Sequence, residues 1–406
     1  MKAYERLLNY VRIPTASSEN SGTVPTTKCQ FNLAHLLVTE MLEMGIADAH
    51  VDEKCYVYGT IPATPGYEEK TKLGFIAHMD TVSDFAEKQV QPQVHPDYDG
   101  QDLPLGSSGR ALEAAAFPHL PSLKGRTLIT SDGTTILGAD DKAGIAEILT
   151  MAEELLKGEI PHGQVSIGFT PDEEVGSGAD HFDVAGFGAE FAYTVDGGRE
   201  GEIEYENFNA ASASVTVNGF NIHPGSAKDT MVNAGLVAME FNGMLPAGQT
   251  PRDTEGYEGF YHMMRIEGTV EKASMSYIIR DHDFQGYEER LEILKRTAKE
   301  LNAKYGEGTV SVEIKESYRN MAEKIRPCYH LIENAMEAAR KAGVEPLVVP
   351  IRGGTDGARL SYMGLPCPNL GTGGFAFHGP YEHITAEGME IAARTLVEIV
   401  KIYAER

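Results

Sequence analysis

The first two hundred residues alternate between short apolar runs and segments with apolar residues at helical spacing. Residues 72–80, 163–170 and 190–198 are compact apolar runs that end at Gly, Pro or a charged residue, which predicts strands. Residues 143–158 predict a helix, and residues 1–20 predict an amphipathic helix. This alternation favours an α/β sheet with helices on its faces.

The middle of the chain follows a different order. Strands are predicted over residues 209–219, 260–270, 274–283 and 309–318, and helices over residues 229–245 and 287–306. The order β-α-β-β-α-β is typical of a ferredoxin-like unit. The α/β pattern then resumes, with a helix, a short buried strand and a closing helix over residues 328–343, 346–351 and 386–406. We therefore expect a discontinuous domain, 1–206 and 319–406, with a second domain, 207–318, inserted into it.

A long segment between Val82 and Leu128 matches neither pattern. Its apolar residues recur at neither strand nor helix spacing. Because connections of this length are uncommon inside compact domains, we expect the segment to be functional or to have structure of its own.

Composition and charge narrow the class of protein. The net charge of −25 argues against nucleic acid as a partner, since phosphates would be repelled. No apolar run reaches the roughly 18–20 residues of a membrane span, and the N-terminus lacks the pattern of a secretion signal. We therefore expect a cytoplasmic protein. The four cysteines form no CxxC pair, which excludes a thiolate zinc site and a disulfide framework.

Acidic residues and histidines follow several of the predicted strands. The stretch "GFTPDEEVGSG" places Glu173 and Glu174 together after an apolar run, with no Lys or Arg in it. Considered singly, such residues are typical of turns and helix caps. As a group they share one feature, a position after an apolar strand or in a glycine-rich loop: His78, Asp80, Asp140, Glu173, Glu174, Asp196 and His378.

Residues after the carboxyl ends of strands meet in one crevice of an open α/β sheet. Five acids gathered there would repel one another strongly, and divalent cations would resolve that conflict. Imidazole and carboxylate without thiolate suit Zn²⁺, Mn²⁺ or Co²⁺. Two ions roughly 3.5–4 Å apart could share one carboxylate. One of the paired glutamates would then bind metal, and its neighbour would be free to act as a general base.

Five motifs occur in an order that resembles the M20 family of dinuclear zinc peptidases: "HMDTV", "LGADDKAG", "DEEVGSG", "VDGG" and "FHG". The resemblance covers essentially the whole chain. It implies a mixed-sheet catalytic domain that holds two Zn²⁺ per subunit, with Co²⁺ or Mn²⁺ as possible substitutes. It also implies that the inserted ferredoxin-like domain is a lid through which two copies of the chain form a homodimer.

The resemblance also implies roles for individual residues. His78 and Asp196 would hold one zinc, Glu174 and His378 the other, and Asp140 would bridge the two. The Asp140–Asp141 peptide bond would be cis. Asp80 would accept the second ring N–H of His78 and so fix its tautomer. Glu173 would be the general base.

Three further residues are implied as substrate contacts. His223 would reach the active site of the partner subunit and polarise the scissile carbonyl, although alone it is typical of a surface loop. Arg280 and Arg352 would hold the substrate's C-terminal carboxylate, since guanidinium makes bidentate contacts; ordinary ion pairing is the alternative. His383 would support its loop. No motif gives a role to the other nine histidines: His35, His50, His95, His119, His162, His181, His262, His282 and His330.

The motifs are most similar to a branch of the family that removes the N-terminal residue from tripeptides. That similarity rests on "DYDGQDLPL", "FPHLPSLKGRTLITSDGTTILGADDKAG", "NGFNIHPGSAKD" and "IRGGTDGARLS". It implies a small peptide as the partner, with attack by a water that bridges the zinc ions. Two alternatives stay open: a dipeptidase or N-acyl-amino-acid deacylase on the same scaffold, and a non-catalytic protein that binds metal or peptide.

Overall fold

The structure is a computed structural model that describes all 406 residues. It divides into two compact units. Unit 1 comprises Met1–Tyr205, Met321–Val349 and Thr355–Arg406, and unit 2 comprises Glu206–Asn320 and Pro350–Gly354. The expected insertion, 207–318, lies inside unit 2. The five residues from Pro350 to Gly354, expected in the discontinuous domain, belong to unit 2 instead.

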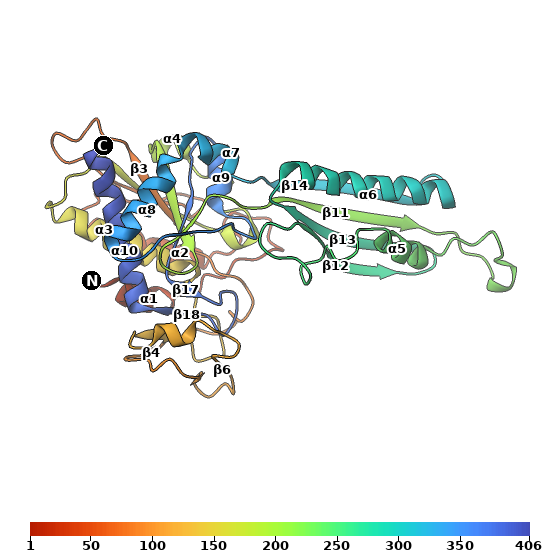
Figure 1. The fold of residues 1–406 in the computed structure, drawn as a ribbon, viewed down its shortest axis with the longest axis horizontal. Coiled ribbons are helices and arrows are strands. Elements are labelled where there is room, and N and C mark those ends of the chain that lie inside the picture. Colours follow the sequence, from red (N-terminus) through yellow and green to blue (C-terminus); the bar gives the residue numbers. More distant parts are fainter. The chain divides into compact units, whose positions relative to one another are not determined.

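A mixed eight-stranded sheet forms the centre of unit 1 (Figure 1). β3 pairs in parallel with β8 and β9, whereas β2 joins β8 antiparallel. This confirms the predicted mixed α/β architecture. In spatial order the strands are β1 (His50–Val51), β2 (Val57–Ile61), β8 (Val165–Thr170), β3 (Leu73–His78), β9 (Phe191–Gly197), β16 (Asn369–Gly371), β10 (Glu202–Glu204) and β15 (Leu347–Val348).

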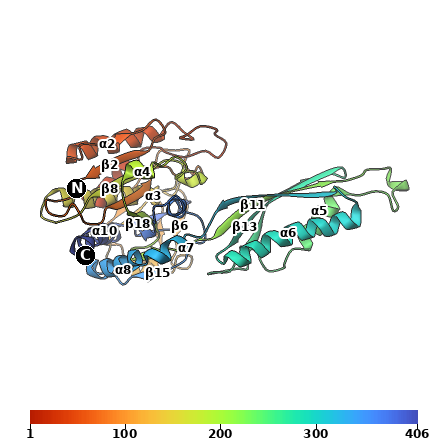
Figure 2. The ribbon, with the colours of Figure 1, turned by 90° about the horizontal axis from the view of Figure 1, so that it is seen from above.

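Helices cover both faces of this sheet. α3 packs on β3, β9 and α10, and α10 lies beside α8 (Figures 1 and 2). The opposite face carries α4 and α9, and its core includes Ile76, Phe182 and Leu360. The helices of unit 1 are α1 (Ala3–Tyr10), α2 (Gln30–Met44), α3 (Ala139–Leu156), α4 (Val184–Phe187), α7 (Ala322–Ile325), α8 (His330–Ala342), α9 (Asp356–Tyr362) and α10 (Ala386–Glu405). None of the helices in the structure combines the length and apolar character that crossing a membrane requires.

Two of the predicted elements in unit 1 are wrong in extent or burial. The helix expected over residues 1–20 ends at Tyr10, because Pro14 and the polar residues around it do not continue a helix. The strand expected to be buried over residues 346–351 is only β15, at the edge of the sheet. Leu347 and Val348 are 40% and 38% exposed there, since no further strand covers them.

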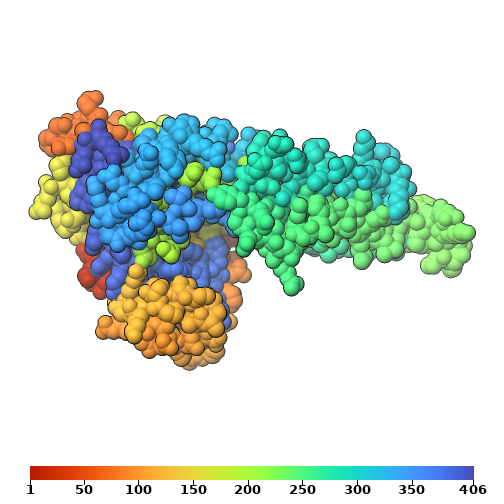
Figure 3. Space-filling view, viewed as in Figure 1, coloured from red at the N-terminus to blue at the C-terminus, as the bar shows by residue number.

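The segment between Val82 and Leu128 has structure of its own, as predicted. Its apolar residues form a separate small core that includes Tyr98, Leu105 and Leu120. Figure 3 shows the segment in orange and gold as a lobe on the surface of unit 1. A second sheet joins the lobe to the C-terminal part of the chain, in the order β17 (Gly374–Phe375), β18 (His383–Thr385), β7 (Leu128–Thr130) and β4 (Gln93–His95). The lobe also contains β5 (Leu103–Pro104), β6 (Ala111–Leu112) and η1 (Leu120–Leu123).

Unit 2 is the predicted β-α-β-β-α-β unit. Its four strands are antiparallel in the order β12-β13-β11-β14, and α6 runs along the sheet (Figure 2). In β13, buried and half-buried residues alternate, because one face of the sheet packs under the two helices. The elements are β11 (Asn209–Asn218), α5 (Ala234–Gly243), β12 (Phe260–Gly268), β13 (Lys272–Asp281), α6 (Phe284–Tyr305) and β14 (Val310–Tyr318).

Candidate metal centre

The predicted ligands meet at the carboxyl ends of three neighbouring parallel strands. His78 is the last residue of β3, and Asp196 lies near the end of β9. β8 leads into the short 3₁₀ helix η2 (Glu173–Val175), which carries Glu173 and Glu174. Parallel neighbours end at the same edge of a sheet, so these side chains converge although they are far apart in sequence.

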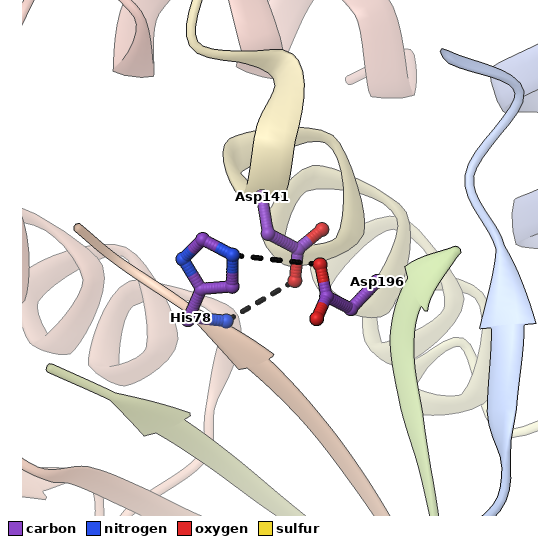
Figure 4. Close-up of side chains that lie close together, drawn as sticks. All are labelled: His78, Asp141 and Asp196. Carbon is purple, nitrogen blue, oxygen red and sulfur yellow. Dashed lines mark hydrogen bonds and ion pairs between the residues drawn. The ribbon is translucent and has the colours of Figure 1, made fainter. Parts of the chain in front are cut away.

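The carboxylate of Asp140 lies between two histidines. Its Oδ1 is 3.0 Å from His78 Nε2, and its Oδ2 is 2.9 Å from His378 Nε2. His78 Nε2 is also 3.4 Å from Asp196 Oδ1, a contact that Figure 4 shows at the end of β3. His378 Nε2 lies 3.1 Å from Glu174 Oε2. Each oxygen of Asp140 therefore faces a different cluster of donor atoms.

These separations fit ligands that share metal ions. Two atoms bound tetrahedrally to one Zn²⁺ at about 2.0–2.1 Å lie about 3.3 Å apart. The donor atoms around the two histidines are 2.9–3.4 Å apart. In addition, Glu174 Oε1 is buried without a hydrogen-bond partner, which is costly for a carboxylate that has no cation beside it. The imidazole and carboxylate donors thus fit two divalent cations.

The electrostatics of the cluster favour bound positive charge. Hydrogen bonds to Asp140 and Glu174 raise the pKa of His378 to about 11. Burial opposes protonation of His78, but Asp196 and Asp140 outweigh it and raise the pKa of His78 well above its usual range. Burial raises the pKa of Asp196 itself to about 7. A group of anions that draws protons onto both histidines would be neutralised equally well by divalent cations.

Asp80 lies beside the second ring nitrogen of His78. His78 Nδ1 lies 3.0 Å from the backbone carbonyl of Asp80 and 3.5 Å from its carboxylate, so the carbonyl is the better acceptor. The carboxylate of Asp80 instead accepts the backbone N–H groups of Glu173 and Glu174 at 2.9 and 3.2 Å. Those two bonds orient the carboxylate towards η2, and they hold in place the turn that presents both glutamates.

Glu173 lies beside the cluster at the start of η2. Burial, together with the negative charge of Asp196, raises the pKa of Glu173 well above its usual range. Perturbed carboxyl groups of this kind are typical of functional sites. The structure therefore places Glu173 where the sequence expected a general base, next to the ligands but outside the pairs of donor atoms.

Three buried acids near the cluster were missed by the sequence analysis. Asp141, whose peptide bond with Asp140 is cis as the resemblance implies, accepts the backbone N–H of His78 at 3.1 Å (Figure 4). Its carboxylate also lies within 4.8 Å of the ligand atoms of His78 and Asp196. Asp356, in the motif "IRGGTDGARLS", accepts the hydroxyl of Thr170 at 2.8 Å. Glu382 accepts the backbone N–H groups of Leu137, Gly138 and Asp140, at the start of α3.

Asp141 and Asp356 lie in motifs that the sequence marks, but their contacts could not be predicted, because partners such as His78 and Thr170 are distant along the chain. A buried cation also lies near them. Lys142 donates to the carbonyl of Ile13 at 2.9 Å; burial lowers the pKa of Lys142 to about 8, and the fields of Glu382 and Asp80 oppose that change. Lys142 thus supplies part of the positive charge that offsets these buried carboxylates.

The three predicted substrate contacts all lie in unit 2. His223 is exposed, and its Nδ1 accepts the backbone N–H of Gly225 at 3.1 Å. The Arg280 guanidinium lies over the ring of Tyr318 at 5.1 Å. Arg352 does not make the ion pair considered as its alternative role. Instead it donates to backbone carbonyls, with the shortest bond, 2.6 Å, to Gly256.

His383 is fully buried below the loop that carries His378. Its Nδ1 donates to the carbonyl of Tyr381 at 2.7 Å, and its Nε2 lies 2.8 Å from His119 Nε2. Because the His383 proton is on Nδ1, His119 is the donor in that second bond. The two rings are stacked, with Phe375 parallel to His119 at 4.2 Å. His119, which no motif singled out, thus connects the 83–127 lobe with the C-terminal segment.

The chain belongs to Peptidase family M20/M25/M40, whose profile matches residues 132–402. Within that family it is similar over its whole length to proteins named peptidase T. One from Clostridium perfringens (strain ATCC 13124) is 54% identical over 406 residues, which is 100% of both chains. Another, from Bacillus licheniformis, is 51% identical over 407 residues, or 100% of this chain and 99% of the relative. The family resemblance noted in the motifs is therefore confirmed, and the protein is a peptidase.

Solved structures share this fold. The aminopeptidase PepT from Bacillus cereus superposes with a TM-score of 0.78 at 23% identity, covering 100% of this chain and 98% of the other. A tripeptidase from Staphylococcus aureus gives a TM-score of 0.80 at 23% identity with the same coverage. A dinuclear metal-binding peptidase from Bacillus subtilis gives 0.63 at 18% identity, covering 99% and 98%. These likenesses confirm the predicted fold class.

Proposed function

We propose that the protein is a two-metal aminopeptidase that releases the N-terminal residue of tripeptides. The observation that carries this proposal is the carboxylate of Asp140, whose two oxygens face His78 and His378 at 3.0 and 2.9 Å. Full-length relatives named peptidase T support the substrate class. So does the structural neighbour described as a tripeptidase.

In this proposal His78 and Asp196 would hold one cation, Glu174 and His378 would hold the other, and Asp140 would serve as a ligand of both. The donor set favours Zn²⁺, with Co²⁺ or Mn²⁺ as substitutes. A pair of divalent cations would supply a water whose pKa is lowered towards roughly 7, and would polarise the scissile carbonyl.

Glu173 is the residue of this chain that moves the proton. Its carboxylate takes a proton from the attacking water and delivers it to the leaving amine. Asp80 keeps Glu173 in place by accepting its backbone N–H at 2.9 Å. A protein that only bound metal or peptide would have no use for a base beside the ligands, which argues against the non-catalytic alternative.

The substrate roles of His223, Arg280 and Arg352 stay predictions. The exposed imidazole of His223 suits a group that reaches a neighbouring subunit. The guanidinium of Arg280 stacks on the ring of Tyr318, and this contact holds the planar group in one orientation. Arg352 already donates to three carbonyls, so of the two arginines Arg280 has more donor capacity left for a substrate carboxylate.

We also propose that unit 2 forms a homodimer. Large apolar side chains are exposed on α5, where Leu236 and Met239 are 64% and 65% accessible. β12 is an edge strand that pairs only with β13, and Met264 and Ile266 on it are 59% and 48% exposed. An open edge beside exposed apolar residues is a surface that a second copy can cover.

A peptide panel in the presence of added Zn²⁺ or Co²⁺ tests the proposal. We expect hydrolysis of tripeptides with a free amino terminus, and little or none of dipeptides, tetrapeptides or N-blocked peptides. Dialysis against a chelator should abolish the activity, and divalent metal should restore it. Preferred hydrolysis of a dipeptide or an acetylated amino acid would replace the proposal with one of the other activities considered for this scaffold.

A further inference from the structure

Glu382 connects the loop that carries His378 with the start of α3, which carries Asp140. It lies at the end of the loop between β17 and β18, four residues after His378. Its side chain is 1% exposed. From there the carboxylate reaches the loop that precedes α3, which is about 240 residues earlier in the chain.

Both oxygens of Glu382 are used in this contact. Oε2 accepts the backbone N–H groups of Leu137 and Gly138, each at 2.7 Å, and Oε1 accepts that of Asp140 at 3.0 Å. The first N–H groups of a helix have no partner within the helix, so a carboxylate is well suited to bind them. Here the carboxylate comes from a distant segment rather than from a local cap.

The same contact sets where the shared ligand lies. Asp140 has non-helical backbone angles at the start of α3, so helix geometry alone does not fix its side chain. Glu382 holds its backbone N–H directly. Because Glu382 and His378 belong to one short loop, the contact also sets the separation between His378 and the Asp140 carboxylate, which is 2.9 Å.

We propose that Glu382 is a positioning residue that fixes the distance between Asp140 and His378, and thereby sets the affinity for the second cation. This inference rests on the two-metal site proposed above. Groups that orient metal ligands typically change metal affinity by about 10–100-fold when they are replaced. His78 and Asp196 are held by β3 and β9, so we expect the cation they bind to be less affected.

The chain offers a matched control. Glu387, in the first turn of α10, also uses its carboxylate to accept a backbone N–H, that of Thr127 at 2.8 Å. It has no hydrogen bond to the loop before α3. The substitutions Glu382→Gln and Glu387→Gln therefore remove the same charge and the same type of bond, but only the first acts on the metal ligands.

The experiment is a competition titration of the full-length metal-free protein with Zn²⁺ and a chromogenic chelator, repeated with Co²⁺ to record its visible spectrum. For the parent protein we expect two bound ions. For Glu382→Gln we expect the second cation, the one assigned to Glu174 and His378, to bind about 10–100-fold less tightly. The Co²⁺ spectrum should change as well. Glu387→Gln should match the parent in both measurements. Glu382→Asp, which keeps the charge on a shorter side chain, should fall between the two.

An unchanged second affinity in Glu382→Gln would overturn the inference, and so would an equal loss in Glu387→Gln. If Glu382→Gln fails to fold by circular dichroism, Glu382→Asp decides: parental affinity overturns the inference, and an intermediate loss supports it. The proposed function fails separately. A parent protein that binds two ions but cleaves no peptide refutes the aminopeptidase activity, and the comparison of metal affinities still stands.

Discussion

His378 Nε2 lies 2.9 Å from Asp140 Oδ2, on the opposite side of that carboxylate from His78. The histidine comes from a glycine-flanked loop, and its side chain is 54% exposed. The other imidazole of the cluster is buried at the end of β3. The fold therefore holds His78 more firmly than His378. We expect that His378 can be replaced without unfolding the protein.

His378→Ala tests that difference. We expect bound metal to fall from two ions towards one and turnover of a tripeptide to drop by at least about 100-fold, because the second cation loses its only imidazole. The free energy of unfolding of the metal-free protein should fall by about 1–3 kcal/mol without loss of the fold, because the protonated imidazole that faces Asp140 and Glu174 is removed. Metal analysis, kinetics and denaturant titration check these outcomes. His35→Ala, at an exposed position of α2, is the control; two tightly bound ions in His378→Ala would contradict the ligand assignment.

Glu173→Gln separates proton transfer from metal binding. The amide has nearly the same size but cannot accept the proton of the attacking water. We expect kcat to fall by about 10²–10⁴-fold while the metal content stays at the parental value. Turnover close to that of the parent, with both ions bound, would show that Glu173 is not the base.

Asp80→Asn tests the turn that presents the two glutamates. Its carboxylate accepts the backbone N–H groups of Glu173 and Glu174, and an amide can accept only one of them. The other N–H would face an NH₂ group in a buried place, so we expect a loss of about 1–3 kcal/mol in the free energy of unfolding. Activity should fall as well, because η2 carries the proposed ligand Glu174 and the proposed base Glu173. Denaturant titration and kcat measure the two effects; a stable, fully active variant would show that the turn holds itself.

Three of the proposed metal ligands could be placed near one another because each follows an apolar strand that is visible in the sequence. His78, Glu174 and Asp196 end three such runs, and the rule that parallel strands end at one edge brings them together. The order of elements in unit 2 was equally visible, since strand alternation and helix periodicity differ clearly there. In both cases the spacing of apolar residues along the chain was sufficient to predict the elements.

Contacts between distant segments could not be predicted in this way. The bonds from Glu382 to Leu137 and Gly138 depend on where two irregular loops meet, and nothing near "GPYEH" indicates it. Which atom of Asp80 lies nearer to His78 Nδ1 could not be predicted for a similar reason, since it depends on the bonds between the carboxylate and η2. An apolar run such as residues 346–351 predicts that a strand forms. It does not show whether that strand lies at the centre or at the exposed edge of the sheet.

Substitutions on α5 test the proposed dimer. Leu236 and Met239 are exposed on α5, so lysine at both positions should leave unit 2 folded but place charges in the interface. We expect the dimer to weaken by at least about tenfold in sedimentation equilibrium. If His223 acts on the partner's substrate, activity should then depend on protein concentration. Leu42→Lys, at an exposed position of α2 in unit 1, is the control, and a monomeric parent protein would contradict the proposal.

The fully buried His383 and its half-buried partner His119 should make the protein less stable in mild acid. Burial lowers the pKa of His383 to about 4, and it lowers the pKa of His119 as well. The unfolded chain binds a proton at each histidine near pH 6.5, whereas the folded chain resists protonation. The stability that the neutral His383 contributes is therefore present above about pH 6.5 and is lost as the pH falls towards about 4.

The measurement compares the free energy of unfolding of the parent with that of His383→Asn, with a chelator present so that metal binding does not contribute. Asparagine does not titrate, and it can still donate to the carbonyl of Tyr381, as His383 does at 2.7 Å. Between about pH 7.5 and pH 5 we expect the parent to lose about 2 kcal/mol more than the variant does. His119→Asn should shift the pH dependence in the same direction. Equal losses in the parent and in His383→Asn would mean that His383 is protonated in the folded protein, with the bond between the two Nε2 atoms broken.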